Sequence, residues 1–224
     1  MISVIIPTLN EEAGIRQCID SLLSEECGCE IIIADGGSRD RTSEYAAGYP
    51  GVKFVRSPKG RGMQMNTGAA AASGDILLFL HADTVLEKGW SKELPAALDD
   101  NRVAGGAFSF SIRSRSGKYR LVETWVALRC KICSLPYGDQ AIFARKSAFD
   151  LINGYRNIPL MEDVDFVERL KKLGAMAILN KKAETSERRW SRKGFIKTTA
   201  TNQLIMLLYR LGVSPATLAR MYYR

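Results

Sequence analysis

The chain has 224 residues, 46% of them hydrophobic and 25% charged, which fits an ordinary globular protein with one substantial core. No stretch approaches the roughly 18 uninterrupted apolar residues of a membrane-spanning helix. The N-terminus has no basic region and no small-residue cleavage site, so we expect no signal peptide and a cytoplasmic protein.

The net charge of +8 lies entirely in the last part of the chain, because residues 1–187 hold 24 basic and 24 acidic side chains. Residues 188–224 hold eight basic side chains and no acidic one. We therefore expect a domain over 1–187 and a basic amphipathic C-terminal tail over 188–224, drawn to phospholipid, a phosphorylated substrate or nucleic acid. The contact with anionic membrane would run through Arg188, Arg189, Arg192 and Lys193. The apolar residues of the tail either form a surface helix or pack onto the core.

Short apolar runs alternate with helix-like stretches over the first 85 residues. In the first helix, apolar residues recur at helical spacing behind Asn10, which we expect to be the N-cap. This β-α-β order predicts an α/β fold with a mostly parallel central sheet, helices on both faces, and a ligand beyond the carboxyl ends of the strands. The expected strands are Ser3–Ile6, Glu30–Ala34, Val52–Val55 and Ile76–Leu80, and the expected helices are Glu11–Leu23, Arg41–Tyr49 and Met63–Ala72.

The second half continues with further strands and two helices. The second of these helices has Leu173 among its inward residues and Gly174 as its stop signal. The expected strands are Gly105–Ile112, Gln140–Ala144 and Ala175–Leu179, and the expected helices are one through Trp125 and Leu128 and one over Glu162–Leu173.

Polar clusters follow three strands, and in a parallel sheet they converge on one crevice. They are Pro7-Thr8-Leu9-Asn10-Glu11, Asp35-Gly36-Gly37-Ser38 and His81-Ala82-Asp83. Each cluster alone is an ordinary turn sequence, but three together favour a binding site. Asp35 is suited to accept hydrogen bonds from a base or ribose.

His81 and Asp83 follow a very apolar strand, and alternate residues of an extended segment point the same way. The two side chains would then face one Mg²⁺ or Mn²⁺ ion, held together with diphosphate oxygens. The alternative is that Asp83 caps the next turn and His81 fills space. Other nucleotide sites fit poorly, because no P-loop is present and Met65 stands where the dinucleotide fingerprint needs its third glycine.

In order and spacing, the chain resembles glycosyltransferase family 2, with the Rossmann-like A-type glycosyltransferase fold. The motifs that carry the resemblance span residues 1 to about 174. They are Val4–Glu11, Asp35–Thr42, Asn66-Thr67-Gly68, Gly74-Asp75 with Leu80–Asp83, and Gly154-Tyr155 through Glu162-Asp163. Lys59–Gly68 is also similar to a short family-2 subgroup associated with radical-SAM/selenium-domain proteins and arsenosugar genes.

The resemblance implies roles for these residues. Residues 1–100 would form a nucleotide-binding half and 101–187 an acceptor-binding half. Donor-binding residues would be Pro7, Thr8, Asn10, Glu11, Asp35, Asn66, His81, Ala82 and Asp83, with Lys59 or Arg61 at the phosphates. Asp83 and His81 match the Asp-x-Asp metal motif, Asp163 matches the catalytic base with Glu162 beside it, and the acceptor pocket would include Gly138, Asp139, Gln140, Arg189 and Trp190. His81 in place of the first acid, and Gly36 in place of a second aspartate, are departures from the family pattern.

Glu162 and Asp163 have an alternative reading, because acids at a helix N-terminus stabilise the helix dipole without any catalytic role. With the resemblance, we expect a metal-dependent, inverting transfer of a sugar from a nucleotide-diphosphate donor to an acceptor hydroxyl, which a lipid could carry. The rivals are a sugar nucleotidyltransferase, whose Gly/Lys/Arg-rich loop is missing from Pro7–Glu11, and a non-enzymatic binder of anionic surfaces or nucleic acid. We expect no nucleic-acid partner, and the sequence leaves open whether the chain forms a homodimer.

Overall fold

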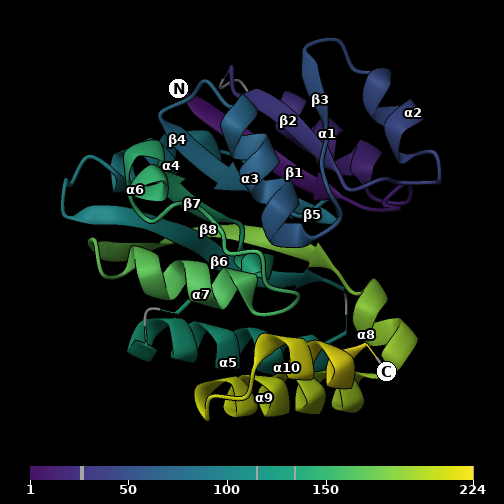
Figure 1. The fold of residues 1–224 in the computed structure, drawn as a ribbon, viewed down its shortest axis with the longest axis vertical. Helices are drawn as coiled ribbons and strands as arrows, with labels where there is room; N and C mark the ends of the chain where they lie inside the picture. The colour runs from purple at the N-terminus through teal and green to yellow at the C-terminus, as the bar shows by residue number, and fades with distance from the viewer. Residues whose placement is uncertain (26–27, 115, 134, 224) are drawn as a thin grey trace.

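The computed structural model describes residues 1–25, 28–114, 116–133 and 135–223, and an eight-stranded sheet runs through it (Figure 1). The strand order is β3-β2-β1-β4-β7-β6-β8-β5. The strands are β1 (Ile2–Thr8), β2 (Glu30–Asp35), β3 (Val52–Arg56), β4 (Ile76–Phe79), β5 (Thr84–Leu86), β6 (Val103–Arg113), β7 (Ile142–Arg145) and β8 (Ala175–Ser186).

The first four strands are all parallel, as the β-α-β order predicts. Strand β7 then runs antiparallel to both β4 and β6, β6 and β8 are parallel, and β5 closes the edge antiparallel to β8. This direction change brings the amino end of β7 to the same edge as the carboxyl ends of β1, β2 and β4. The expected α/β fold with a mostly parallel sheet is confirmed.

Helices cover both faces of the sheet, and the alternation of side chains along the strands explains why. In β1, Val4 and Ile6 pack under one face with α1, while Ile5 faces the other side with Met65 of α3. The helices are α1 (Ile15–Leu23), α2 (Thr42–Ala47), α3 (Arg61–Ala71), α4 (Trp90–Ala97), α5 (Lys118–Cys133), α6 (Lys146–Leu151), α7 (Glu162–Leu170), α8 (Arg188–Lys193), α9 (Phe195–Arg210) and α10 (Pro215–Tyr222).

Two sequence predictions about helix ends were wrong. Asn10 is not the N-cap of α1, because the helix begins at Ile15 and its N-cap is Gly14, after a turn in which Gly14 N and Ile15 N both donate to Glu11 O at 3.0 Å. Leu173 is exposed, because α7 ends at Leu170 and the chain turns before β8. The sequence prediction also missed β5, α4 and α6, which are short and lack strong periodicity.

The C-terminal segment forms three helices that lie along the end of the molecule farthest from β1–β3 (Figure 1). Ile205 and Met206 of α9 and Leu218 of α10 are buried in the core on the α7 side of the sheet. Trp190 of α8 is buried with Phe110 of β6. Of the two alternatives for the apolar residues of the tail, packing onto the core is therefore the one the structure shows for these side chains.

Candidate active site

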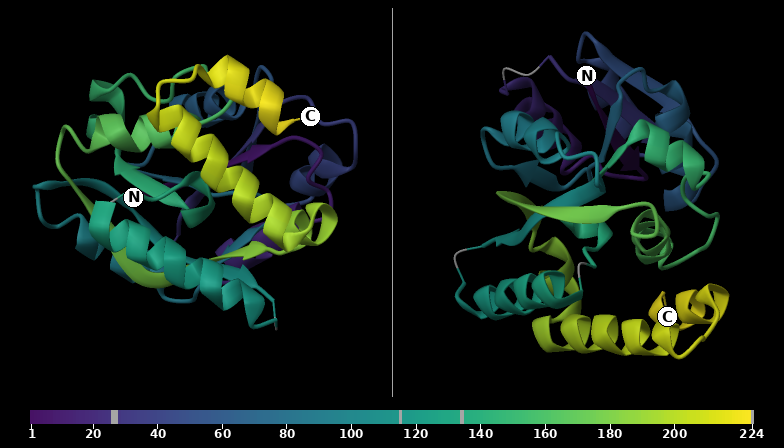
Figure 2. Two further views of the ribbon diagram at one scale, coloured as in Figure 1. Left: turned by 90° about the horizontal axis from the view of Figure 1, so that it is seen from below. Right: turned by 90° about the vertical axis from the view of Figure 1, so that its left-hand side faces the viewer.

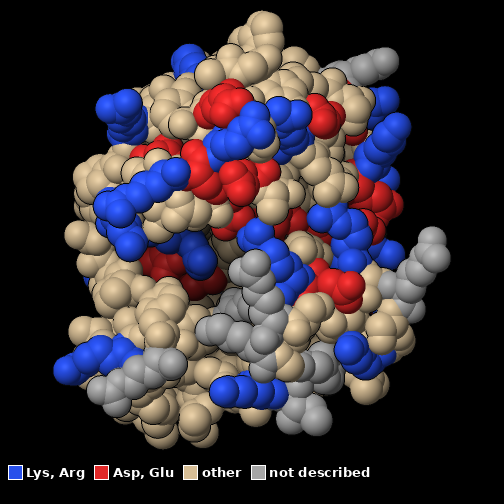
Figure 3. Space-filling model, turned by 90° about the vertical axis from the view of Figure 1, so that its right-hand side faces the viewer, with Lys and Arg blue, Asp and Glu red and all other residues tan. Residues whose placement is uncertain are grey.

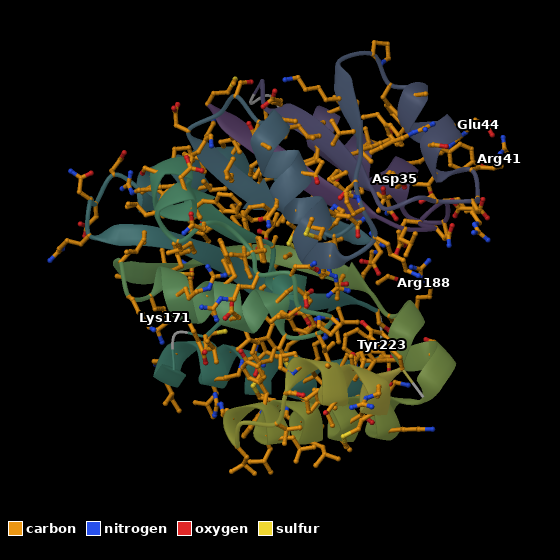
Figure 4. All side chains as sticks on the ribbon, in the orientation of Figure 1. Asp35, Arg41, Glu44, Lys171, Arg188 and Tyr223 are labelled. Carbon is orange, nitrogen blue, oxygen red and sulfur yellow. The ribbon has the colours of Figure 1, made fainter. Side chains whose placement is uncertain are left out.

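The three polar clusters meet at the carboxyl edge of the sheet. The pairing of Thr8 with Asp35 puts the ends of β1 and β2 side by side, and Gly36 N donates to Thr8 O at 2.9 Å. Strand β4 pairs with the other edge of β1, and Leu80 N donates to Ile5 O at 2.9 Å. Figure 4 shows Asp35 and Arg188 on this side of the molecule.

Asp35 is buried, and its carboxylate is already used within the protein. Its Oδ1 accepts from the hydroxyls of Thr8 and Ser38, and its Oδ2 accepts from the amides of Gly37 and Ser38, both at 2.9 Å. A carboxylate has about four acceptor positions, so these bonds fill them. A bond from Asp35 to a nucleoside stays a prediction, and it requires one of these partners to be replaced.

Asn10 joins the first cluster to the second. Its amide N donates to Ser38 Oγ at 2.9 Å, its side-chain Oδ1 accepts from Arg39 N at 2.8 Å, and its backbone φ is 57°. Asparagine tolerates this left-handed conformation better than most residues. Asn10 therefore holds the loop that contains Glu11 against the second cluster.

Gln64 of α3 is a residue that the sequence analysis missed. It is buried, and its Nε2 donates to Thr8 O at 2.6 Å and to Ala34 O at 3.0 Å, so one side chain ties together the ends of β1 and β2. A glutamine on the inward side of an otherwise small-residue helix was the only signal in the sequence.

Glu11, Asp83 and Arg188 form a charged group at the rim. Arg188 Nη2 donates to Glu11 Oε2 at 2.8 Å. Burial raises the pKa of Glu11, while Arg188 opposes the rise and the nearby Asp83 carboxylate adds to it. Two carboxylates and a guanidinium from distant parts of the chain therefore share one electrostatic environment, and Arg188 was absent from the predicted site.

The argument that placed His81 and Asp83 on one face of an extended strand was wrong. Strand β4 ends at Phe79, and His81 to Thr84 form a turn in which Thr84 N donates to His81 O at 3.0 Å. The His81 Nε2 atom lies 3.4 Å from the point that a Cβ on Gly138 would occupy, so the ring extends toward Gly138. Whether either side chain binds a metal remains a prediction.

The residues around Asp83 fit a hard divalent cation that is shared with a diphosphate. Carboxylate oxygens are the ligands that Mg²⁺ and Mn²⁺ prefer, and Glu11 stands near Asp83. Gly14 allows the close approach, since a Cβ there would lie 2.8 Å from Ala82 O and 3.2 Å from Asp83 Cα. Within the described residues, no group of three or more acidic, histidine or cysteine side chains is placed to hold a metal ion.

Asp163 stands at the start of α7, facing the β7 side of the site. Gly138 N donates to its Oδ2 at 2.6 Å, and Val164 N donates to its Oδ1 at 2.8 Å. A Cβ on Gly138 would lie 3.0 Å from Asp163 Oδ2 and 3.4 Å from His81 Nε2, so glycine lets the two side chains converge. Residues predicted as base, acceptor pocket and metal motif thus come together at Gly138.

Glu162 is buried next to Asp163 and forms an ion pair with Arg61, whose Nη1 lies 3.2 Å from Glu162 Oε1. Burial raises the pKa of Glu162; Arg61 opposes this rise and the Asp163 charge increases it. Arg61 is half-exposed and is the first residue of α3. The sequence predicted that it binds phosphates. Lys59 is exposed two residues earlier.

Three other predicted site residues have structural contacts. The Asn66 amide both donates to Tyr155 O and accepts from Tyr155 N at 2.8 Å. Gln140 is buried and donates to Phe108 O at 3.1 Å, and the ring of Trp190 packs against Phe110 and Tyr119. Their contact with donor or acceptor stays a prediction, as does that of Asp139. The side chains of Arg189, Arg192 and Lys193 lie outside the described residues.

A hollow of about 510 Å³ lies at the carboxyl ends of β6 and β8, next to Arg188 in the chain. Its lining mixes charges of both signs: Ser111, Ile112, Arg113, Ser114, Arg120, Lys182, Glu184 and Glu187. None of these residues was predicted from the sequence. Figure 3 shows that the right-hand face of the molecule is hollowed near its centre, with basic and acidic side chains gathered around it.

These converging acids lie at the carboxyl edge of the sheet, the place where open α/β folds bind their ligands. The family model of Glycosyl transferase family 2 matches residues 3–152. The chain belongs to this family and is a glycosyltransferase, which decides against the nucleotidyltransferase and the non-enzymatic rivals.

Two curated relatives illustrate the range of similarity. A PGL/p-HBAD biosynthesis glycosyltransferase of Mycobacterium bovis is 31% identical over 178 residues, covering 74% of this chain and 68% of the relative. The probable glycosyltransferase YdaM of Bacillus subtilis is 28% identical over 199 residues, covering 77% of this chain and 47% of that protein. The chain thus spans less than half of YdaM.

Solved structures share the fold at low identity. TarS residues 1–349 of S. aureus in complex with UDP align with a TM-score of 0.65 at 18% identity, covering 83% of this chain and 61% of that one. The mannosyltransferase PcManGT of Pyrobaculum calidifontis, in complex with GDP-Man and Mn²⁺, aligns with a TM-score of 0.60 at 15% identity, covering 82% and 56%. The chain spans about 60% of the length of these structures.

Proposed function

We propose that the protein transfers a sugar from a nucleotide-diphosphate donor to an acceptor hydroxyl, in one displacement that inverts the anomeric carbon. The Asp163 carboxylate takes the proton of the hydroxyl, the oxygen forms the new bond to the anomeric carbon, and the bond to the diphosphate breaks. A divalent cation bound at Asp83 would neutralise the charge that builds on the departing diphosphate.

The observation that carries this proposal is the convergence at Gly138, where Asp163 and His81 approach from opposite elements. A base must stand within hydrogen-bond reach of the acceptor while the diphosphate lies on the other side of the reacting carbon. In this proposal Asp163 on α7 lies on the acceptor side and the His81–Thr84 turn after β4 lies on the diphosphate side. Two neighbouring structures, one in complex with UDP and the other with GDP-Man and Mn²⁺, support the donor class and the metal.

The hydroxyl acceptor and its location belong to the same proposal. A lipid-carried acceptor would bring the protein to the inner face of the membrane from the cytoplasm. The helices of the described residues include none that is both long and apolar enough to span a bilayer.

Calorimetric titration with UDP, GDP, CDP and ADP, with and without Mn²⁺, tests the proposal. We expect one diphosphate to bind with an affinity that excess chelator weakens by at least about tenfold, a difference of about 1.4 kcal/mol. The matched control is the corresponding nucleoside, which lacks the phosphates and should show little response to Mn²⁺. Absence of binding by any of the four diphosphates would overturn the proposed donor class.

A further inference from the structure

Helix α5 carries a continuous apolar stripe on its solvent side. Leu121, Trp125, Leu128 and Ile132 follow one another at helical spacing, and the exposed fractions are 74%, 55%, 48% and 71%. The opposite side of the helix is buried through Tyr119 in the cluster with Phe110. Soluble monomers rarely leave such a row of large apolar side chains in water unless it binds something.

Helix α9 repeats this arrangement beside α5. Its inward residues Ile205 and Met206 are buried, while Leu204, Leu207 and Leu211 are about half or more exposed. Figure 2 shows α5, α9 and α10 lying side by side across one end of the molecule, and Figure 1 shows the same end from the side. We define the apolar face as the exposed apolar residues of α5 and α9, which are Leu121, Trp125, Leu128, Ile132, Leu204, Leu207 and Leu211.

The exposed charged side chains that α5, α9 and α10 themselves carry are basic. Lys118, Lys131, Arg210 and Arg220 are exposed on these helices. Helices α9 and α10 contain no acidic residue, and the one acid of α5, Glu123, is turned inward to Ile112 N at 2.7 Å and to Arg120. A second copy of this face would be repelled by its like charge, whereas an anionic surface would be attracted.

We propose that the apolar face is a docking surface for an anionic phospholipid bilayer, with the leucines, Ile132 and Trp125 in the interfacial region and the basic residues at the headgroups. This inference deepens the proposed membrane contact and rests on it. It moves that contact from α8, where Arg188 is paired with Glu11, to α5 and α9. Tyr223, just after α10, lies close to Arg61, so the end of α10 borders the acid pair of the site.

Tryptophan fluorescence can locate the contact, because Trp125 is the exposed one of the three tryptophans in the chain. Trp90 and Trp190 are 1% and 7% exposed, so a change on vesicle addition would report Trp125. We expect a blue shift, and quenching by brominated lipid, with vesicles of phosphatidylcholine and phosphatidylglycerol. Trp125→Phe should keep most of the binding and lose the shift.

The decisive comparison uses two double variants. The test variant carries Leu121→Ser and Leu128→Ser in the apolar face. The matched control carries Leu23→Ser and Leu151→Ser, at exposed leucines on α1 and α6. Losing the burial of two leucines should weaken co-sedimentation with the anionic vesicles by at least about tenfold. The control pair should bind as the parent does. High salt should weaken the parent's binding without abolishing it, because the apolar part is not screened.

Equal vesicle binding by both double variants, or no binding by the parent, would overturn the inference. So would a parent dimer in light scattering that the Leu121→Ser, Leu128→Ser variant converts to monomer, since the face would then be covered by a second copy. Nucleotide titration separates the failure of the docking surface from the failure of the proposed function. The Leu121→Ser, Leu128→Ser variant should bind the nucleoside diphosphate as the parent does. If the parent binds vesicles but no nucleotide, the proposed function fails and the docking surface is supported.

Discussion

The fold compensates Glu30 at the amino end of the sheet more fully than it compensates Glu11 and Glu162 at the carboxyl end. At the amino end, Glu30 opens β2 and accepts bonds from Ser3 of β1, Lys53 of β3 and both the amide and hydroxyl of Ser73. Burial alone would raise the pKa of Glu30, but the bonds from Lys53, Ser3 and Ser73 outweigh it and lower the pKa to about 2. This acid is fully paired by the fold.

At the carboxyl end, burial raises the pKa of both Glu11 and Glu162 in spite of their arginine partners. Acids whose charge the fold does not fully compensate are typical of functional sites, because a cation or a substrate completes them. The hydrogen bonds of Glu30 at one end of the sheet therefore stabilise the fold, whereas the charges of Glu11 and Glu162 at the other end are only partly compensated. Substitutions at the two ends should therefore change different measured quantities.

The largest expected contrast lies at the two ends of β4. Asp83→Asn should reduce transfer to background while leaving the melting temperature unchanged, because a metal ligand would be lost from a half-exposed turn. Asp75→Asn, at the exposed amino end of the same strand, is the matched control and should keep the parent's activity. Full activity of the parent in excess chelator would contradict the prediction that Asp83 binds a metal ion needed for transfer.

Asp163→Asn should lower the transfer rate by roughly 10²–10⁴, the usual contribution of a general base, with nearly unchanged melting and donor binding. If Asp163 only stabilises the helix, removal of its charge would cost up to about 1 kcal/mol of stability and leave the rate intact. Glu162→Gln should have a milder effect on rate. Transfer within about threefold of the parent in Asp163→Asn would make the residue a helix cap.

Glu30→Gln tests the other end of the sheet. The ordinary pKa of 4.5 falls to about 2 on folding, so the stabilisation from Glu30 is fully present above pH 4.5 and is lost as the pH falls toward about 2. Since Lys53 is half-exposed, we expect the variant to lose about 1–3 kcal/mol of unfolding free energy at pH 7. The difference from the parent should shrink in acid. Glu44→Gln, in an exposed ion pair, is the control for denaturant unfolding.

The first half of the fold was predictable because each strand there is a short apolar run followed by a helical period. The register of Thr8 with Asp35 confirms the convergence that this order predicts. The reversal at β7 and the length of β8 were not predictable, since antiparallel pairing and edge position depend on contacts distant in sequence. Strand β8 continues beyond the predicted Ala175–Leu179 through a mostly polar stretch that ends at Ser186.

The site was predictable as a set of motifs and not as a set of contacts. The polar clusters at the strand ends brought out Asp83 and the family resemblance brought out Asp163, but the sequence could not show that the Asp35 carboxylate accepts its hydrogen bonds from its own loop. Nor could it show that Arg188, 177 residues from Glu11, would return to the donor end. Such pairings follow from the path of the chain after β8, for which the sequence carries no local signal.

Arg188→Gln gives the smallest expected effect and sharpens the account of the carboxyl end. Removal of the guanidinium leaves Glu11 and Asp83 as uncompensated acids beside the place proposed for the diphosphate. Nucleoside diphosphate affinity should fall by about two- to fivefold, as for a half-exposed ion pair, and the loss should shrink at high salt. Arg220→Gln, exposed on α10, is the control and should leave affinity unchanged in calorimetric titration. A tighter affinity in Arg188→Gln would contradict this reasoning, because it would mean that Arg188 occupies the position of the cation at Glu11 and must leave before the metal and the diphosphate can bind.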